Sequence, residues 1–296
     1  ENLYTQKSSQ NSLIIGPLDK RSLNQLATFE RLNTNTLALN YLDDTQINIE
    51  NLFQFGLAPE SETKQIAQRL SKKHLQKVGI IAPEDNWGIR LHDAFVKDSS
   101  LEENTLIESV FYSDQASLSA TVAKLLATDE SNNRAKSIRS ITKTSFEFLP
   151  RRRKDIDAIV MIARPNMAKQ INPLFAYHYA NSIPVFSTSH VNSGTKGNND
   201  LDDVEFIEMP WMLSNTIDLK SQINTIIPES TQTYMRFYAL GVDAFNLAPR
   251  LTLLKEVRDS KINGQTGILS MNNTGYINRE MEWAKFSNGK TIAIKE

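Results

Sequence analysis

Short apolar runs rich in β-branched residues recur along the chain and alternate with segments of helical periodicity. The runs occupy residues 12–16, 36–42, 52–57, 77–83, 105–112, 158–163, 184–189 and 204–211. Several are apolar at successive positions, which is typical of strands buried on both faces of a parallel sheet. Residues 60–74 and 117–127 carry apolar side chains at helical spacing between these runs. The alternation predicts a doubly wound α/β architecture.

Residues 233–247 form the most aromatic of the predicted helices. One face carries Tyr234, Phe237, Tyr238, Val242 and Phe245 at helical spacing. Burial against a core produces such a stripe more often than an aromatic binding surface does. We therefore interpret the stripe as a core-facing side of the helix.

The pattern changes after residue 250, where glycines become frequent and the apolar runs shorten. Asn-Gly pairs stand at 263–264 and 288–289. Asn-Gly between short apolar runs is a strong signal for a two-residue hairpin turn. Residues 263–296 are therefore predicted to add antiparallel hairpins to an otherwise parallel fold.

Residues 128–157 interrupt the alternation with a long polar segment. Between 131 and 157, eight basic residues stand against three acidic ones, a local charge of +5. The segment is longer than an ordinary connection in an α/β domain. We predict an insertion that is partly mobile at its start.

Arg151, Arg152 and Arg153 lie in this insertion, directly before the apolar run 158–163. That position is the amino end of a strand, whereas ligands of parallel sheets bind beyond the carboxyl ends. Two interpretations remain open. The arginines pair with neighbouring aspartates or helix C-termini on a solvated surface, or they form a docking surface for an acidic partner.

Composition restricts the chemistry further. With 33 basic and 34 acidic residues, the net charge of −1 gives no global field for nucleic acid or a membrane surface, so no nucleic-acid partner is expected. The chain has no cysteine, which excludes disulfides, thiolate catalysis and cysteine-ligated metals within it. It also has no run of about 18 apolar residues, so no transmembrane helix is predicted.

The chain begins at Glu1, and its first ten residues have the character of a helix end that feeds the strand at 12–16. We expect from this a fragment whose first structural unit or units are missing. The likeness of the first four residues to the remnant of a protease site is the competing explanation.

Recognised catalytic patterns are absent. The sequence contains no G-x-S-x-G, no P-loop, no G-x-G-x-x-G and no H-E-x-x-H. Its four histidines fall in different predicted units without the spacing of metal ligands. No pair of acidic residues stands out as an acid–base couple. We predict that the chain is not an enzyme and that it has no metal site and no cofactor.

Loops at the carboxyl ends of the predicted strands offer the clearest candidate binding site, because ligands of open α/β sheets bind there. The ligand-crevice candidates in these loops are Gly16, Pro17, Tyr41, Asn86, Trp87, Arg164, Ser187, Thr188, Ser189 and His190. A helix cap would explain Asn86 without any ligand. An ion pair with a neighbouring carboxylate is an even alternative for Arg164.

Eight segments of the chain carry a resemblance to a known family. In order, they are IIGPL, LALN, GLAPESE, FLPRRRKDIDAIVMIARP, PVFSTSHVNSG, MPWML, MRFYALGVDAFNL and GQTGILS. Each is weak alone, but their joint presence in this order is specific. From about residue 4 to its end, the chain resembles the C-terminal domain of the LpoA (LppC) lipoprotein family.

This resemblance implies a type I periplasmic-binding-protein-like fold, with two doubly wound α/β lobes joined by a multi-stranded hinge. Residues 1–58 and 205–262 would form lobe one, which lacks its first strand–helix unit and so exposes a sheet edge. Residues 59–204 would form lobe two with the basic insertion. Residues 263–296 would form the C-terminal hairpins near the hinge.

The resemblance also implies a role. Members of the family are lipoproteins on the periplasmic face of the outer membrane, and they activate a class A penicillin-binding protein, the bifunctional peptidoglycan synthase 1A. A lipid anchor outside this chain would make the only membrane contact. On this view, Arg151, Arg152 and Arg153 are candidates for the surface that contacts the partner.

Two functions therefore fit the sequence. The first is a non-enzymatic regulator that binds and activates the synthase, which rests on the resemblance and on the absent catalytic motifs. The second is a periplasmic receptor for a small polar ligand, such as an amino acid or a cell-wall fragment, which rests on the polar loops at the strand ends. A hydrolase is the least favoured reading.

Overall fold

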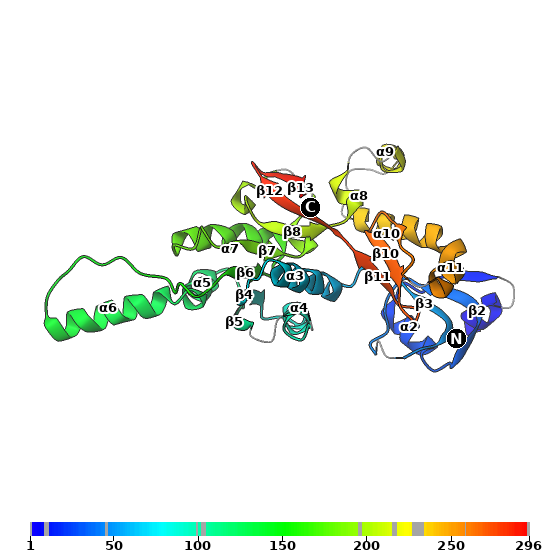
Figure 1. Cartoon of the computed structure of the whole chain (residues 1–296), viewed down its shortest axis with the longest axis horizontal. Helices are drawn as coiled ribbons and strands as arrows, with labels where there is room; N and C mark the ends of the chain where they lie inside the picture. The colour runs from blue at the N-terminus through cyan, green and yellow to red at the C-terminus, as the bar shows by residue number, and fades with distance from the viewer. Residues whose placement is uncertain are drawn as a thin grey trace. The chain divides into compact units, whose positions relative to one another are not determined.

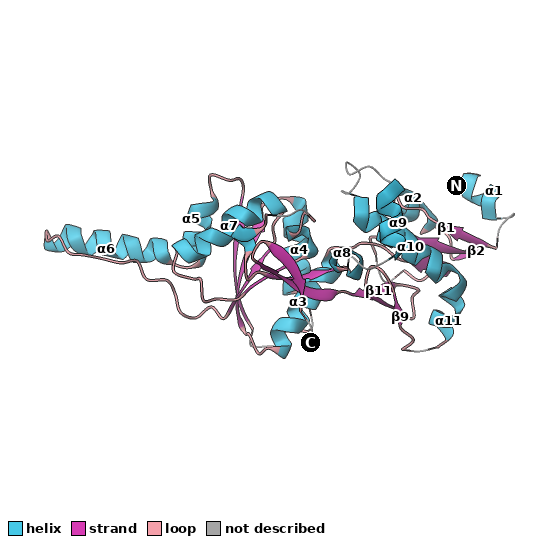
Figure 2. Cartoon of the chain, turned by 90° about the horizontal axis from the view of Figure 1, so that it is seen from above, coloured by secondary structure: helices cyan, strands magenta, loops and turns pink. Residues whose placement is uncertain are grey.

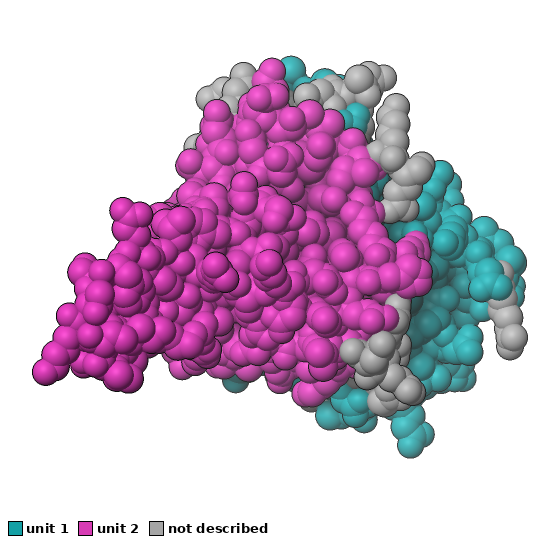
Figure 3. Space-filling view, turned by 60° about the vertical axis from the view of Figure 1, so that its left-hand side comes forward, with its two compact units in different colours: residues 1–61, 209–282 teal, residues 62–208, 283–296 magenta. Residues whose placement is uncertain are grey.

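The computed structural model describes residues 2–8, 12–44, 47–98, 100–101, 105–194, 197–214, 218–226, 234–257 and 259–294. They divide into two compact units, which are coloured separately in Figure 3. Unit 1 comprises Glu1–Ser61 and Met209–Glu282, and unit 2 comprises Glu62–Glu208 and Trp283–Glu296. The lobe boundaries at 58/59, 204/205 and 262/263 stay predictions.

Unit 2 is built on a sheet in the order β13-β12-β8-β7-β6-β4-β5 (Figure 1). Its strands are β4 (Lys77–Pro83), β5 (Leu106–Tyr112), β6 (Ala158–Met161), β7 (Val185–Ser187), β8 (Glu205–Glu208), β12 (Glu282–Ser287) and β13 (Lys290–Ala293). From β5 to β8, neighbouring strands pair in parallel. β6 is buried along its whole length, as the continuous apolar run predicted.

Helices cover both faces of this sheet. They are α3 (Glu60–Lys72), α4 (Asn86–Val96), α5 (Leu118–Leu125) and α7 (Pro165–Tyr177), with short 3-10 turns at Ser189–Val191 and Asn199–Leu201. Val78 and Ile80 of β4 belong to a core cluster with residues of α3 and α4. Gly79, which points to the other face, lies against Leu125 of α5. The doubly wound arrangement predicted for this part of the chain is therefore present.

The basic insertion begins with a helix that the sequence pattern did not predict. α6 (Thr128–Thr142) extends away from the sheet of unit 2 in both Figure 1 and Figure 2, and residues 143–157 return without regular structure. Acidic residues in its first turn suit the positive end of the helix dipole. Glu130 and Arg134 add an i,i+4 ion pair. A helix stabilised by such polar contacts lacks the repeating apolar positions from which helices are predicted in a sequence.

Unit 1 combines a parallel and an antiparallel sheet. The parallel sheet has the order β1-β2-β3 and the antiparallel sheet the order β11-β10-β9. Their strands are β1 (Leu13–Ile15), β2 (Arg31–Ala38), β3 (Glu50–Gln54), β9 (Ile262–Asn263), β10 (Ile268–Met271) and β11 (Ile277–Glu280). Its helices are α1 (Asn2–Ser8), α2 (Lys20–Leu26), α8 (Pro210–Leu213), α9 (Asp218–Ile226), α10 (Met235–Leu247) and α11 (Leu251–Glu256), with a 3-10 turn at Ala248–Arg250.

One core joins the two sheets of unit 1. Leu37 and Phe53 from the parallel sheet pack with Leu269 and Ile277 from the antiparallel sheet, beneath α10. Gly275 lets the antiparallel sheet approach β3 closely, because a Cβ atom there would lie 2.6 Å from the Leu52 carbonyl oxygen.

The C-terminal hairpins are confirmed. β10 pairs antiparallel with β11, and β12 pairs antiparallel with β13. Asn288 and Gly289 both have positive φ, 51° and 68°, as a primed two-residue turn requires. The Asn-Gly signal therefore located this turn correctly, whereas Asn263 lies in β9 and pairs with Ile268, so the pair at 263–264 does not form a two-residue turn.

The aromatic stripe of α10 faces outward, so its interpretation as the core-facing side was wrong. Tyr234, Phe237 and Phe245 are exposed, whereas Leu240 and Leu247 on another face are buried. Small and aliphatic residues on that second face pack onto the sheets beneath it. Because both faces are apolar at helical spacing, periodicity alone could not decide which one packs on the core.

Candidate functional site

Three loops of unit 2 meet beyond the carboxyl ends of β4, β6 and β7. The Arg164 guanidinium lies over the Trp87 ring at 4.6 Å from its centroid and donates to Asp85 Oδ2 at 2.9 Å. The ring centroids of Trp87 and His190 are 5.3 Å apart. Three of the sequence candidates are thus neighbours, although they lie far apart in the chain.

Asp85 organises one side of this cluster. It is the N-cap of α4, and its Oδ1 accepts a hydrogen bond from the Gly88 N–H at 2.8 Å. Burial alone would raise the pKa of Asp85, but the bonds from Gly88 and Arg164 outweigh it and hold the pKa below its usual value. The sequence offered Asn86 as a helix cap, but Asn86 is exposed at the first position of the helix and Asp85 is the N-cap. The ion-pair alternative for Arg164 is therefore realised, while its stacking on Trp87 keeps it in the cluster.

Glu62 of α3, which is 3% exposed, binds the turn that follows β7. Its two carboxylate oxygens accept hydrogen bonds from the Ser189 N–H at 2.8 Å and the Ser189 Oγ at 2.9 Å. His190 Nδ1 lies 3.8 Å from the same carboxylate. Sequence reasoning missed Glu62, because an acidic residue within an amphipathic helix carries no signal of burial.

Ser187 and Thr188 differ in their hydrogen bonding although both are buried. Ser187 Oγ donates to the Met161 carbonyl at 2.6 Å, so it ties β7 to β6. Thr188 Oγ1 has no hydrogen-bond partner among the residues that the structure describes. A buried hydroxyl without a hydrogen-bond partner is energetically costly, and in this respect Thr188 differs from Ser187.

The unit 1 candidates differ in their surroundings. The Tyr41 hydroxyl lies 2.9 Å from the Ile277 carbonyl and 3.2 Å from that of Gly56, and its ring stacks on Tyr276. Burial raises the pKa of Tyr41. Gly16 and Pro17 line a mostly apolar cavity of about 350 Å³ beside β1.

The arginine triplet lies at the amino end of β6, where the sequence placed it. Arg153 donates to both oxygens of Asp155 at 2.8 Å and lies 3.1 Å from Glu108. These bonds raise the pKa of Arg153 and lower the pKa of Asp155 to about 2.

In the described part of the chain, the other two arginines of the triplet are not paired with carboxylates in this way. Arg152 donates to the Tyr179 carbonyl at 2.7 Å. Arg151 is exposed, and its backbone N–H donates a hydrogen bond to Ser131 Oγ. Charge pairing thus accounts for Arg153 and leaves the side chain of Arg151 facing solvent.

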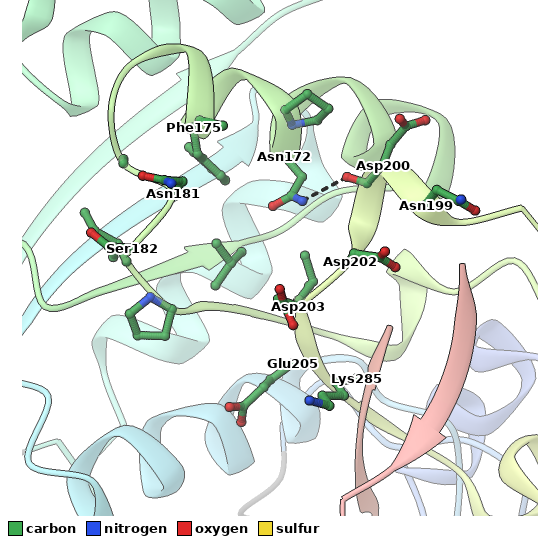
Figure 4. A pocket seen from close by; sticks show the side chains of 17 residues that line it. Asn172, Phe175, Asn181, Ser182, Asn199, Asp200, Asp202, Asp203, Glu205 and Lys285 are labelled. Atoms are coloured by element: carbon green, nitrogen blue, oxygen red, sulfur yellow. Dashed lines mark hydrogen bonds between the residues drawn. The ribbon is translucent and has the colours of Figure 1, made fainter. Parts of the chain in front are cut away.

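A separate pocket of about 620 Å³ opens in unit 2 at the amino ends of β7 and β8 (Figure 4). None of the ligand-crevice candidates lines it. Two of the carboxylates that line it have partners. Glu205 forms an ion pair with Arg69 at 2.9 Å, and Asp202 accepts a hydrogen bond from the Gly289 N–H at 2.9 Å. The described part of the chain holds no group of three or more His, Cys, Asp or Glu that could bind a metal ion.

A family model described as LppC putative lipoprotein matches residues 1–289. The chain belongs to this family. Penicillin-binding protein activators LpoA from Vibrio antiquarius and Vibrio cholerae are similar to this LppC-family chain, at 29% identity over 280 residues and 28% over 284 residues. The matches cover 92% and 94% of the chain but 46% and 47% of the relatives. The chain thus spans about half the length of these relatives.

Solved structures agree on the fold of this LppC-family chain. The LpoA C-domain from Haemophilus influenzae, described as a regulator of PBP1A, matches with a TM-score of 0.75 at 19% identity, over 99% of the chain and 86% of that domain. A putative branched-chain amino acid ABC transporter structure from Chromobacterium violaceum matches with a TM-score of 0.69 at 21% identity, over 96% and 83%. The predicted periplasmic-binding-protein-like α/β fold is confirmed. None of the described helices is long and apolar enough to cross a membrane.

Proposed function

We propose that this chain is the periplasmic-binding-protein-like part of an activator that binds a class A penicillin-binding protein and stimulates peptidoglycan synthesis. The observation that carries the proposal is the family match over residues 1–289, with relatives named penicillin-binding protein activators. The role is regulatory and needs no catalytic group in the chain. The proposal includes attachment to the periplasmic face of the outer membrane through a lipid anchor outside this chain.

A binding assay tests this proposal. Purified protein and the periplasmic region of the bifunctional synthase are expected to form a complex that survives gel filtration or capture on beads. A class B penicillin-binding protein, which lacks the glycan-polymerising domain, serves as the negative control. If the synthase is not retained under any salt condition, the proposed partner is wrong.

We further propose that Arg151, with its neighbours Arg152 and Arg153, contributes to the surface that contacts the synthase. Arg151 supports this because its guanidinium is exposed, whereas Arg153 is already paired with Asp155 and Glu108. Arg151→Glu is expected to weaken binding about three- to tenfold at low salt and less at high salt. Lys143→Glu, an equal charge reversal on the same insertion, is the matched control. Equal affinity of Arg151→Glu and the parent protein would remove the triplet from the interface.

A second candidate function is the binding of a small polar ligand. The buried Thr188 hydroxyl without a partner, beside the Trp87–Arg164–His190 cluster, favours it. Amino acids and muropeptides are expected to raise the thermal midpoint of unfolding in proportion to ligand concentration. The response should vanish in Arg164→Ala. No shift with any of these compounds would exclude this second function for them.

A further inference from the structure

The outward face of α10 carries exposed apolar side chains that neither the fold nor the proposed function explains. Phe237 is 50% and Phe245 74% exposed, and Tyr234 lies exposed at the start of the same stripe. On the neighbouring helix α9, Leu219 and Ile226 are also exposed. Contiguous apolar residues on a surface mark interaction sites far more often than single exposed residues do.

A groove of about 530 Å³ lies along this face. Leu219 and Ile223 of α9 form one wall, and Phe237, Val242 and Phe245 of α10 form the other. Both walls are helices, so their backbone groups are used internally and no strand edge is offered for β-sheet pairing. The groove can therefore take up side chains, as in helix-in-groove recognition.

Gly241 is one of the residues that line the groove. It occupies the middle of α10, where glycine weakens a helix relative to alanine. A Cβ atom built on Gly241 would meet no atom within 4 Å, so packing inside the protein does not require glycine there. A glycine at this position leaves room for the close approach of a second backbone.

The length and charge of the groove restrict its occupant. From Tyr234 to Phe245 the stripe rises roughly 16 Å, about three helical turns. Among the described charged side chains of α9, α10 and the following 3-10 turn, Asp243 is the acidic one, and Arg250 donates to the carbonyl of Asn246, which lines the groove. The Asp243 carboxylate is buried and accepts hydrogen bonds from Gln265 and Thr266. A complementary helix would therefore carry carboxylates beside its apolar face.

We propose that the α9–α10 groove is the docking site for an amphipathic helix of the class A penicillin-binding protein, with apolar residues in the groove and carboxylates at its rim. This rests on the proposed function, because the helix belongs to the synthase. The backbone of the helix passes over Gly241, and its apolar side chains pack between Phe237 and Phe245.

The test measures the affinity of the full-length protein for the purified periplasmic region of the synthase. Gly241→Leu places an apolar side chain in the groove, and its Cβ atom meets no atom of the protein within 4 Å. The double variant Phe237→Ser/Phe245→Ser removes the apolar wall. Leu18→Ser is the matched control, since Leu18 is a 51% exposed apolar residue of the same unit.

Both groove variants are expected to weaken binding at least tenfold, while the control stays within about twofold of the parent protein. Thermal midpoints should be unchanged or, for Gly241→Leu, higher.

If the parent protein binds and the groove variants bind equally well, the groove is not the docking site, while the proposed function stands. If the double variant instead lowers the thermal midpoint at unchanged affinity, another part of the same polypeptide covers the groove and the proposal is overturned. If the parent protein fails to bind, both proposals fail.

Discussion

At the scale of single residues, Glu62 decides the shape of the turn that follows β7. Its carboxylate binds both the backbone and the hydroxyl of Ser189 and faces His190. The same turn carries His190, whose ring centroid lies 5.3 Å from that of Trp87. One buried acidic side chain therefore positions a turn of the candidate ligand site.

Replacing this carboxylate is expected to destabilise unit 2. Glu62→Ala leaves the Ser189 N–H buried without an acceptor, which costs about 2 kcal/mol of unfolding free energy. Glu62→Gln keeps one carbonyl acceptor and should cost less. Chemical denaturation of the two variants measures the difference. Equal stability of Glu62→Ala and the parent protein would show that the turn does not depend on this carboxylate.

The Arg153–Asp155 pair gives the stability a defined pH dependence. The Arg153 hydrogen bonds hold the pKa of Asp155 at about 2, below its ordinary value of 3.8. Its stabilisation is therefore complete above the ordinary pKa and is lost as the pH falls toward about 2. Because the Asp155 side chain is 49% exposed, Asp155→Asn should cost only about 0.5 kcal/mol at pH 7. Urea titrations at pH 7 and pH 2.5 should show the difference between variant and parent protein shrinking; a constant difference would contradict this.

At the scale of elements, the sequence predicted the strands better than the helix faces. The β4 and β6 runs are buried on both sides, so continuous apolarity located them. α6 was missed because ion pairs and a favourable N-terminus stabilise it rather than an apolar stripe. The α10 stripe was assigned to the core because two apolar faces share one helical period. Which of two such faces packs inward depends on the tertiary partner, and no local pattern carries that information.

Two glycines of unit 1 separate the effects of backbone strain and helix propensity. Gly275→Ala places a methyl group 2.6 Å from the Leu52 carbonyl oxygen at a residue with φ of +77°. It should lower the unfolding free energy by about 2 kcal/mol. Gly241→Ala meets no atom and should raise it by about 0.5–1 kcal/mol. Thermal denaturation compares the two, and a stabilising Gly275→Ala would refute the proposed close approach at β3.

At the scale of the whole molecule, the eight short segments that resemble the family, taken in their order along the chain, predicted the family and its fold. The family model confirms the family, and the solved structures confirm the fold. The candidate site was predicted in part. Trp87, Arg164 and His190 do come together, because the carboxyl ends of parallel strands share one edge of a sheet. Tyr41 and Ser187 were included by the same rule, but their hydroxyls serve the carbonyls of neighbouring strands. Sequence position places a residue at a strand end, whereas its hydrogen-bond partner decides whether it is available to a ligand.

The rate of glycan polymerisation by the purified class A synthase tests the proposed activator role most directly. Adding the full-length protein is expected to raise the rate of glycan synthesis or of peptide crosslinking, saturating with concentration. The response should be weaker for Gly241→Leu than for Leu18→Ser. Unchanged synthase rates at saturating concentrations of the parent protein would show that it does not activate this synthase.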